Sequence, residues 1–228
     1  MRYYSIVYED NDILIVDKMQ GVPTTFGKLA NSLTEMVFND MPYLKDVIGY
    51  NKNEGGLLNR LDNETGGLVL FAKNNESFSY FYSQMKNNRV TKIYTAIVDG
   101  LTKLHSGIVD TPIAHHPKNK KKMIIYQKGS KFGGTIQMAK TKYRLLESFL
   151  DRSLLEIEIT KGVRHQIRVH LSSIGLPIVG DKLYNHKKYS DIPNHLLYSN
   201  RVIFYNRSGE KRSIECKIPF SLRSINWI

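Results

Sequence analysis

Short runs of β-branched and aromatic residues, separated by clusters of turn-forming residues, recur along the whole chain. Tyr4 to Tyr8 and Ile13 to Asp17 are two such runs, and the polar residues between them predict a hairpin. Gly56 to Lys73 predicts a strand, a turn and a second strand. Further strands are expected at residues 92–98, 107–112, 123–127, 135–146, 154–160 and within 195–219.

Helical signals are fewer. The segment 32–41 predicts a helix, because Ser32 is a good N-cap and Glu35 completes a capping-box pattern. A second helix is expected at residues 75–87. A third is expected at residues 167–174, where apolar side chains repeat at i, i+4 and i+7 before a glycine and a proline.

Strands therefore dominate, and they do not alternate strictly with helices. This pattern predicts the α+β class, with a mostly antiparallel mixed sheet and a few flanking helices, rather than a doubly wound parallel sheet. A chain of 228 residues suits a single domain, residues 1–228, or two lobes that share one sheet.

Basic residues are in clear excess. Lysine and arginine number 33 against 21 aspartates and glutamates, which gives a formal net charge of +12. Such a surplus favours a polyanionic partner, because binding releases counterions from phosphates; the alternative is a basic surface that only aids solubility. The sequence has no apolar run near the roughly 20 residues of a membrane span, so no membrane partner is expected. With no signal-peptide pattern and a single cysteine, Cys216, we expect a cytoplasmic protein.

Asp62 is the first candidate for chemistry. In its Asn-Glu-Thr-Gly-Gly context an aspartate is usually a turn residue that binds nearby backbone N–H groups. Two features argue against a purely local role: leucines at 57, 58 and 61 surround it with apolar neighbours, and Arg60 lies two residues before it.

The segment 161–171 holds a second cluster of polar residues. On a helix, Arg164 and Arg168 would be i, i+4 neighbours and point the same way. The alternative is a solvated basic face, although such a face needs neither the two histidines, His165 and His170, nor Gln166. A zinc site is not expected, because the i, i+5 spacing of the histidines does not place both on one face. A bound nucleotide cofactor is not expected either, since the chain has no Gly-x-Gly-x-x-Gly or Walker A pattern.

A basic loop lies between two expected strands. It runs from His115 to Met123 and contains Lys118, Lys120, Lys121 and Lys122. Such a run is usually a solvated loop, but it can also lie against phosphates.

Taken together, these segments resemble the RluA-type pseudouridine synthases. The matching blocks occur in the family's order: residues 58–68 with Ala72-Lys73, the Lys-x-Tyr-x-Ala strand at 92–96, the basic loop at 117–123, and residues 162–170 followed by 175–184. The opening residues 6–10 and 16–18 also fit. The chain departs from the pattern at Asn59, Gly66 and Met19, and the arginine expected after Gly162 stands one position later, at Arg164. An appended S4 RNA-binding domain is not expected.

The resemblance implies an isomerisation of uridine within RNA, with no cofactor and no metal. Asp62 would be the catalytic carboxylate, either as a nucleophile on the ribose or as a base. Tyr94 would stack on the uracil and help to move a proton, and Arg168 would form an ion pair with Asp62. These three residues are the expected catalytic set, in a central RNA-binding cleft.

The target uracil would be flipped out of its stack, with Arg60 filling the vacated space. The expected RNA-binding residues are Arg60, Lys118, Lys120, Lys121, Lys122, Arg164, His165, Gln166, Ile178 and Val179. The expected partner is rRNA or tRNA, bound by a monomer without an obligate protein partner. Two alternatives remain: a catalytically inactive RNA-binding or RNA-folding module on the same scaffold, and an unrelated nucleic-acid enzyme such as a nuclease. The inactive module would be expected to lack Asp62, Tyr94 or Arg168, and a nuclease normally needs clustered carboxylates for metal.

Overall fold

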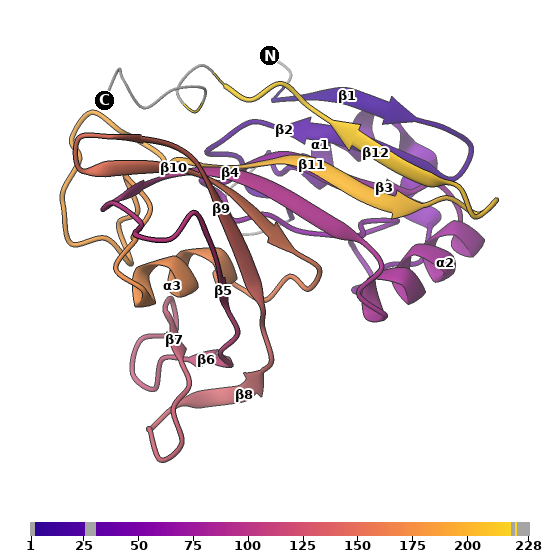
Figure 1. Ribbon diagram of the computed structural model, residues 1–228. Coiled ribbons are helices and arrows are strands. Elements are labelled where there is room, and N and C mark those ends of the chain that lie inside the picture. Colours follow the sequence, from indigo (N-terminus) through magenta and orange to yellow (C-terminus); the bar gives the residue numbers. More distant parts are fainter. Residues whose placement is uncertain (1–2, 26–30, 220–221, 223–228) are drawn as a thin grey trace. The chain divides into compact units, whose positions relative to one another are not determined.

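Two compact units make up the chain, which is described by a computed structural model at residues 3–25, 31–219 and 222 (Figure 1). Unit 1 comprises residues 1–92 and 198–217, and unit 2 comprises residues 93–197 and 218–228.

Unit 1 is built on a mixed sheet in the order β1-β2-β3-β11, with β12 paired to β11. These strands are β1 (Tyr4–Glu9), β2 (Ile13–Lys18), β3 (Gly66–Ala72), β11 (Leu197–Tyr205) and β12 (Lys211–Glu215). β1 and β2 form the predicted hairpin. β2 and β3 are antiparallel, whereas β3 and β11 are parallel and make the sheet mixed. Every residue of β3 is buried, as expected for a central strand.

Two α-helices and one 3-10 helix of unit 1 lie in the part of the chain that the structure describes, and the first begins at its predicted cap. α1 (Leu33–Asp40) has Ser32 as its N-cap, and the capping box with Glu35 is present, so this prediction is confirmed. A 3-10 helix, η1 (Pro42–Asp46), follows. α2 (Asn75–Lys86) has Asn74 as its N-cap. Aromatic pairs join both helices to the sheet, and they are Phe38 with Phe71 for α1 and Phe81 with Phe204 for α2.

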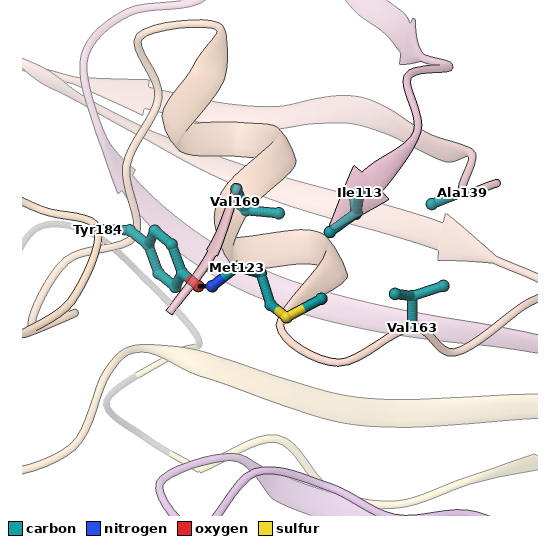
Figure 2. Packing of buried hydrophobic residues seen from close by; sticks show 6 residues of the cluster. All are labelled: Ile113, Met123, Ala139, Val163, Val169 and Tyr184. Atoms are coloured by element: carbon teal, nitrogen blue, oxygen red, sulfur yellow. Dashed lines mark hydrogen bonds between the residues drawn. The ribbon is translucent and has the colours of Figure 1, made fainter. Parts of the chain in front are cut away.

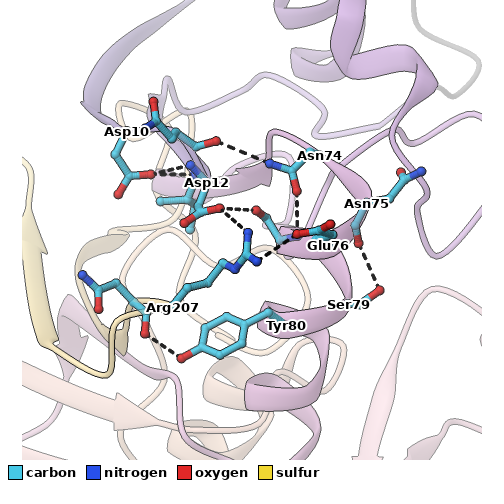
Figure 3. A network of polar contacts seen from close by, with 12 residues as sticks. Asp10, Asp12, Asn74, Asn75, Glu76, Ser79, Tyr80 and Arg207 are labelled. Carbon is cyan, nitrogen blue, oxygen red and sulfur yellow. Dashed lines mark hydrogen bonds and ion pairs between the residues drawn. The ribbon is translucent and has the colours of Figure 1, made fainter.

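Surface ion pairs also connect the turns and helices of unit 1 (Figure 3). Arg207, in the β11–β12 turn, donates to Asp12 in the β1–β2 turn at 3.2 Å and to Glu76 on α2 at 2.8 Å. The Ser77 hydroxyl donates to the same Asp12 carboxylate at 2.6 Å. One arginine therefore links two turns and the start of a helix.

The segment 56–73 is only half strand. β3 accounts for its second half, but the first half contributes an isolated bridge between Leu57 and Phe71. The Asn59 side chain forms hydrogen bonds to β3 in place of the backbone of a neighbouring strand. Its Nδ2 donates to Leu68 O and its Oδ1 accepts from Leu70 N. The predicted strand-turn-strand is therefore wrong at its start.

Among the described residues of unit 2, strands follow one another in the order β4-β10-β9-β5, and a separate three-stranded sheet has the order β7-β6-β8. The strands are β4 (Thr91–Asp99), β5 (Ser106–Val109), β6 (Ile113–His115), β7 (Met123–Ile125), β8 (Gly133–Gln137), β9 (Thr141–Phe149) and β10 (Arg152–Ile159). α3 (Gln166–Ser173) is the third helix. The α+β class with a mostly antiparallel, mixed arrangement is confirmed.

One predicted strand, residues 135–146, is wrong as a single element. It is divided into β8 and β9, which belong to different sheets, and β6 was not predicted. Ala139, in the break, is 4% exposed and joins an apolar cluster that also contains Ile113, Met123, Val163, Val169 and Tyr184 (Figure 2). Burial of the break in this cluster connects the small sheet to α3.

No helix in the described part of the chain is long and apolar enough to cross a membrane.

Candidate active site

Asp62 lies on a turn whose backbone is fixed from both sides. The turn closes with a hydrogen bond from Thr65 N to Asp62 O of 3.0 Å. Beside it, the Thr24 hydroxyl donates to Leu61 O at 2.8 Å and accepts from Leu61 N at 3.1 Å. Leu61 is buried while its neighbours Arg60 and Asp62 are not. The carboxylate is therefore presented by a rigid backbone and remains partly exposed.

A completely buried lysine, Lys18, lies under this turn. Its Nζ donates to the carbonyl oxygens of Met19, Val22 and Asn63 at 3.1, 2.7 and 3.3 Å. Burial lowers the pKa of Lys18 to about 7, although the Asp62 and Asp17 carboxylates favour its charged form. Lys18 was not among the predicted site residues; its only signal in the sequence was the Val-Asp-Lys block at residues 16–18, which also fits the family resemblance.

Replacing Lys18 by Met should change how stability depends on pH. In the wild type the unfolded chain holds the Lys18 proton up to about pH 10.5, but the folded chain releases it near pH 7. Lys18 therefore contributes a rise in the free energy of unfolding between about pH 7 and 10.5. Urea unfolding at several pH values should show this contribution in the wild type and not in the variant.

Lys131→Met is the control, because Lys131 is exposed, and it should behave as the wild type does. An equal pH slope in the wild type and Lys18→Met would contradict the shifted titration.

Two departures from the family pattern have local explanations. At Gly66, a Cβ atom would lie 2.4 Å from the ring of Tyr198, so only glycine fits. That tyrosine is held by a hydrogen bond from its hydroxyl to Asp17 Oδ1 of 2.6 Å. Asn59 binds the backbone of β3, as described above. Nothing in the structure explains Met19.

Arg168, on α3, forms a buried bidentate ion pair in unit 2. Its Nε and Nη2 donate to the two oxygens of Asp181 at 2.7 and 2.8 Å. Burial raises the pKa of Asp181, but the hydrogen bonds and charge of Arg168, together with the backbone N–H of Leu183, lower it by a larger amount. The pKa of Asp181 is therefore lowered overall. Asp181 lies within residues 175–184, which carry the family resemblance, but the sequence did not predict that it pairs with Arg168.

The expected helical pairing of Arg164 with Arg168 is wrong. α3 begins at Gln166, and its N-cap, His165, has a left-handed backbone with φ of 54°. Arg164 therefore precedes the helix and does not share a face with Arg168. Its Nη1 donates to Lys120 O in the basic loop at 3.3 Å.

Tyr184 connects the basic loop to α3. Its hydroxyl accepts from Met123 N at 2.7 Å (Figure 2). The same hydroxyl lies 2.9 Å from His165 Nδ1. The Lys122 Nζ and the Arg168 guanidinium lie 5.4 and 5.2 Å from the centre of its ring. These contacts order the end of the basic loop, which is predicted to lie against RNA phosphates.

The remaining predicted RNA-binding residues differ in exposure. Lys118, Lys120 and Lys121 are exposed, and Lys122 is half-buried. His116 Nδ1 accepts hydrogen bonds from the backbone N–H groups of Lys118 and Asn119, which fixes the loop.

Gln166 is buried, and its amide is used inside unit 2. It accepts from Val163 N and donates to Lys140 O and the Thr141 hydroxyl. Ile178 and Val179 are completely buried as well. Contacts of these three residues with RNA stay predictions to which the structure lends no support.

Tyr94 lies on β4 and is 6% exposed. Asp62 belongs to unit 1, whereas Tyr94 and Arg168 belong to unit 2. Their meeting in one catalytic site stays a prediction.

Comparison with known proteins gives a consistent result. The model of the RNA pseudouridylate synthase family matches residues 12–173. An uncharacterized RNA pseudouridine synthase of Bacillus subtilis is 34% identical over 218 residues, which cover 94% of this chain and 69% of the relative. An uncharacterized RNA pseudouridine synthase of Aquifex aeolicus is 33% identical, with 98% and 72% covered. Ribosomal large subunit pseudouridine synthase D of Pseudomonas aeruginosa is 34% identical, with 97% and 66% covered.

Solved structures show the same fold. Human RNA pseudouridylate synthase domain containing 4 superposes with a TM-score of 0.73 at 26% identity, covering 95% of this chain and 89% of that one. Human RNA pseudouridylate synthase domain containing 1 gives a TM-score of 0.77 at 24% identity, covering 95% and 84%.

Proposed function

Because this chain belongs to the RNA pseudouridylate synthase family, we propose that it isomerises specific uridines in structured RNA, rRNA or tRNA, with Asp62 as the catalytic carboxylate. The family match confirms the resemblance seen in the sequence. The relative named ribosomal large subunit pseudouridine synthase D supports rRNA as one substrate class.

The reaction breaks one bond and forms another at the same ribose carbon. The N1–C1′ bond of the uridine breaks, the uracil rotates, and C5 joins C1′. C5 then loses its proton and N1 gains one, so atoms and electrons balance without an oxidant or reductant. The chain has to supply a carboxylate near the ribose, a group that moves the C5 proton, and a site that holds the flipped base.

The main support for this proposal is the Asp62 turn, whose backbone is held by more side-chain contacts than a simple surface turn requires. Thr24 holds the preceding peptide, and the buried Lys18 holds the carbonyl of the following residue, Asn63. A rigid turn positions the carboxylate before substrate arrives, which lowers the entropy lost on reaching the transition state. Asp62 acts either as a nucleophile on C1′ or as a base on the sugar.

Tyr94 and Arg168 complete the proposed catalytic set. Tyr94 stacks on the uracil and takes part in proton movement. Arg168 favours the ionised form of Asp62, since a guanidinium keeps its charge at any relevant pH. Asp181 supports this role, because it orients the guanidinium through two of its N–H groups.

Two kinds of contact hold the RNA: basic side chains bind its phosphates, and one side chain fills the space left by the flipped base. Arg60, half-exposed beside the Asp62 turn, fills the space that the target uridine leaves. The exposed lysines of the basic loop and Arg164 contact phosphates.

Neutralising the basic loop should weaken the salt dependence of RNA binding. In the quadruple variant with Gln at positions 118, 120, 121 and 122, the slope of log affinity against log salt should flatten by about 0.7–0.9 per lost phosphate contact. Fluorescence anisotropy with a labelled RNA stem-loop measures this slope. An unchanged slope would show that the loop does not contact the RNA backbone.

The proposed function is tested by mapping pseudouridine in rRNA and tRNA from cells with and without this protein. We expect at least one position to carry pseudouridine only when the protein is present. Identical maps would contradict the proposal and favour an RNA-binding module without activity.

A further inference from the structure

Arg60 is held by a buried carboxylate in the loop that precedes it. Its Nη2 pairs with Glu54 Oε1. The Arg60 side chain is 49% exposed, but that of Glu54 is only 9% exposed. The second oxygen of Glu54, Oε2, is buried and accepts no hydrogen bond from any residue that the structure describes. The arginine is therefore the main compensation for this buried charge.

The backbone around Glu54 explains why the carboxylate is buried. A Cβ atom at Gly56 would lie 1.9 Å from Ala72 O, and one at Gly55 would lie 2.3 Å from Leu44 O. Only glycines allow the chain to pass this close to the end of β3 and to η1. The backbone N–H of Glu54 donates to Asn51 O at 3.0 Å, which closes the turn at residues 51–54.

An aromatic residue of the same loop also lies near Arg60. Tyr50 is 45% exposed, and its ring is 5.5 Å from that of Tyr82 and 5.6 Å from that of Phe78 on α2. Burial raises the pKa of Tyr50, while the charge of Arg60 opposes the shift. Arg60 thus has a carboxylate as its direct partner and an aromatic ring within electrostatic reach.

Breaking this pair would leave a charge buried without a partner, which is far more costly than breaking a surface ion pair. The pair should therefore persist when RNA binds. A guanidinium neutralised by a carboxylate is a weak ligand for phosphate, because little net charge remains to release counterions. It keeps its planar face and its other N–H donors, which suit stacking and hydrogen bonding among bases.

We propose that Glu54 is a positioning residue, which holds Arg60 so that this arginine enters the base stack of the RNA rather than binding a phosphate. This inference rests on the proposed function of the chain as an RNA-modifying enzyme and adds a residue outside the blocks that carry the family resemblance.

The test compares salt slopes and rates in Glu54→Gln, Arg60→Ala and the double variant. Slopes are measured with a labelled RNA stem-loop whose loop uridines are unpaired. Rates are measured in single turnover, as tritium release from C5 of uridine, with the RNA identified by pseudouridine mapping. Glu54→Gln should release Arg60 toward phosphates, so the slope should steepen by about 0.7 while the rate falls about tenfold.

Arg60→Ala should leave the slope as in the wild type and lower the rate, because the paired arginine makes no phosphate contact. In the double variant, loss of Glu54 should change neither quantity further. A slope that flattens by about 0.7 in Arg60→Ala would overturn the proposal, as would a steeper slope in Glu54→Gln that persists without Arg60.

Arg60→Lys keeps the test informative if Glu54→Gln does not fold. Glu54 neutralises either cation, so the slope should match the wild type, while the loss of the planar group should lower the rate as Arg60→Ala does. A rate near that of the wild type would contradict the proposal. An absence of turnover by the wild type would instead contradict the proposed function, and the slopes would still test Glu54.

Discussion

Asp62→Asn is expected to lower the single-turnover rate of pseudouridine formation by at least about 10³-fold, because an amide is neither a nucleophile nor a base. RNA affinity should change by less than about threefold, since the phosphate contacts are made elsewhere. The fold should persist, because Thr65 N closes the turn on the backbone oxygen of Asp62 and Thr24 holds the Leu61 peptide before it. Tritium release and anisotropy measure the two quantities.

Asp46→Asn is the matched control. Asp46 is an exposed aspartate of unit 1, at the end of η1, and its replacement should leave the rate unchanged. A rate for Asp62→Asn within about tenfold of the wild type would rule out Asp62 as the catalytic carboxylate.

Arg168→Ala is expected to lower the free energy of unfolding by about 3–5 kcal/mol, because Asp181 would be left as a buried charge without its partner. The loss should depend on pH. In the wild type the pKa of Asp181 is lowered, so its stabilising contribution is present above the unfolded value of 3.8 and is lost as pH falls through the folded value.

Without Arg168, burial would raise the pKa of Asp181 instead. The folded variant would then hold this proton more tightly than the unfolded chain, and its stability would fall as pH rises above about 4. The difference between wild type and variant should therefore be larger at pH 7.5 than at pH 4.5. Urea unfolding at the two pH values checks this, and equal differences would argue against the ion pair.

The double variant Arg168→Ala with Asp181→Asn separates the structural role of Arg168 from its catalytic role. Asparagine removes the unpaired charge, while its oxygen can still accept from Leu183 N and Tyr184 N, as Asp181 does. Stability should partly return, but activity should stay lost if Arg168 also acts on Asp62. Recovery of activity together with stability would show that Arg168 serves only the fold.

Arg164 is exposed, and its replacement by alanine should weaken RNA binding but leave the rate of the chemical step unchanged.

Local signals in the sequence correctly predicted two features of unit 1. The hairpin of β1 and β2 and the capping box of α1 depend on residues within a few positions of each other, so the pattern contains the whole interaction. The break between β8 and β9 could not be predicted, because it depends on Ala139 entering a cluster with residues up to 45 positions away, Tyr184 among them.

In the candidate site, too, local features could be predicted from the sequence, whereas long-range contacts could not. Asp62 was identified from its sequence context, and the structure adds the groups that hold it, Thr24 and Lys18, from more than 35 positions earlier in the chain. The wrong helical pairing of Arg164 with Arg168 arose from a single backbone angle: His165 adopts a left-handed conformation that periodicity does not reveal. The burial of Glu54 depends on how Gly55 and Gly56 pack against other strands and helices, which no local pattern contains.

The most direct test of the account is reconstitution with purified protein. Total RNA from cells that lack the protein is incubated with the wild type or with Asp62→Asn, and pseudouridine is then mapped by position. We expect the wild type to restore pseudouridine at the positions lost in those cells, and Asp62→Asn to restore none. No restoration by the folded wild type, or equal restoration by both proteins, would contradict it.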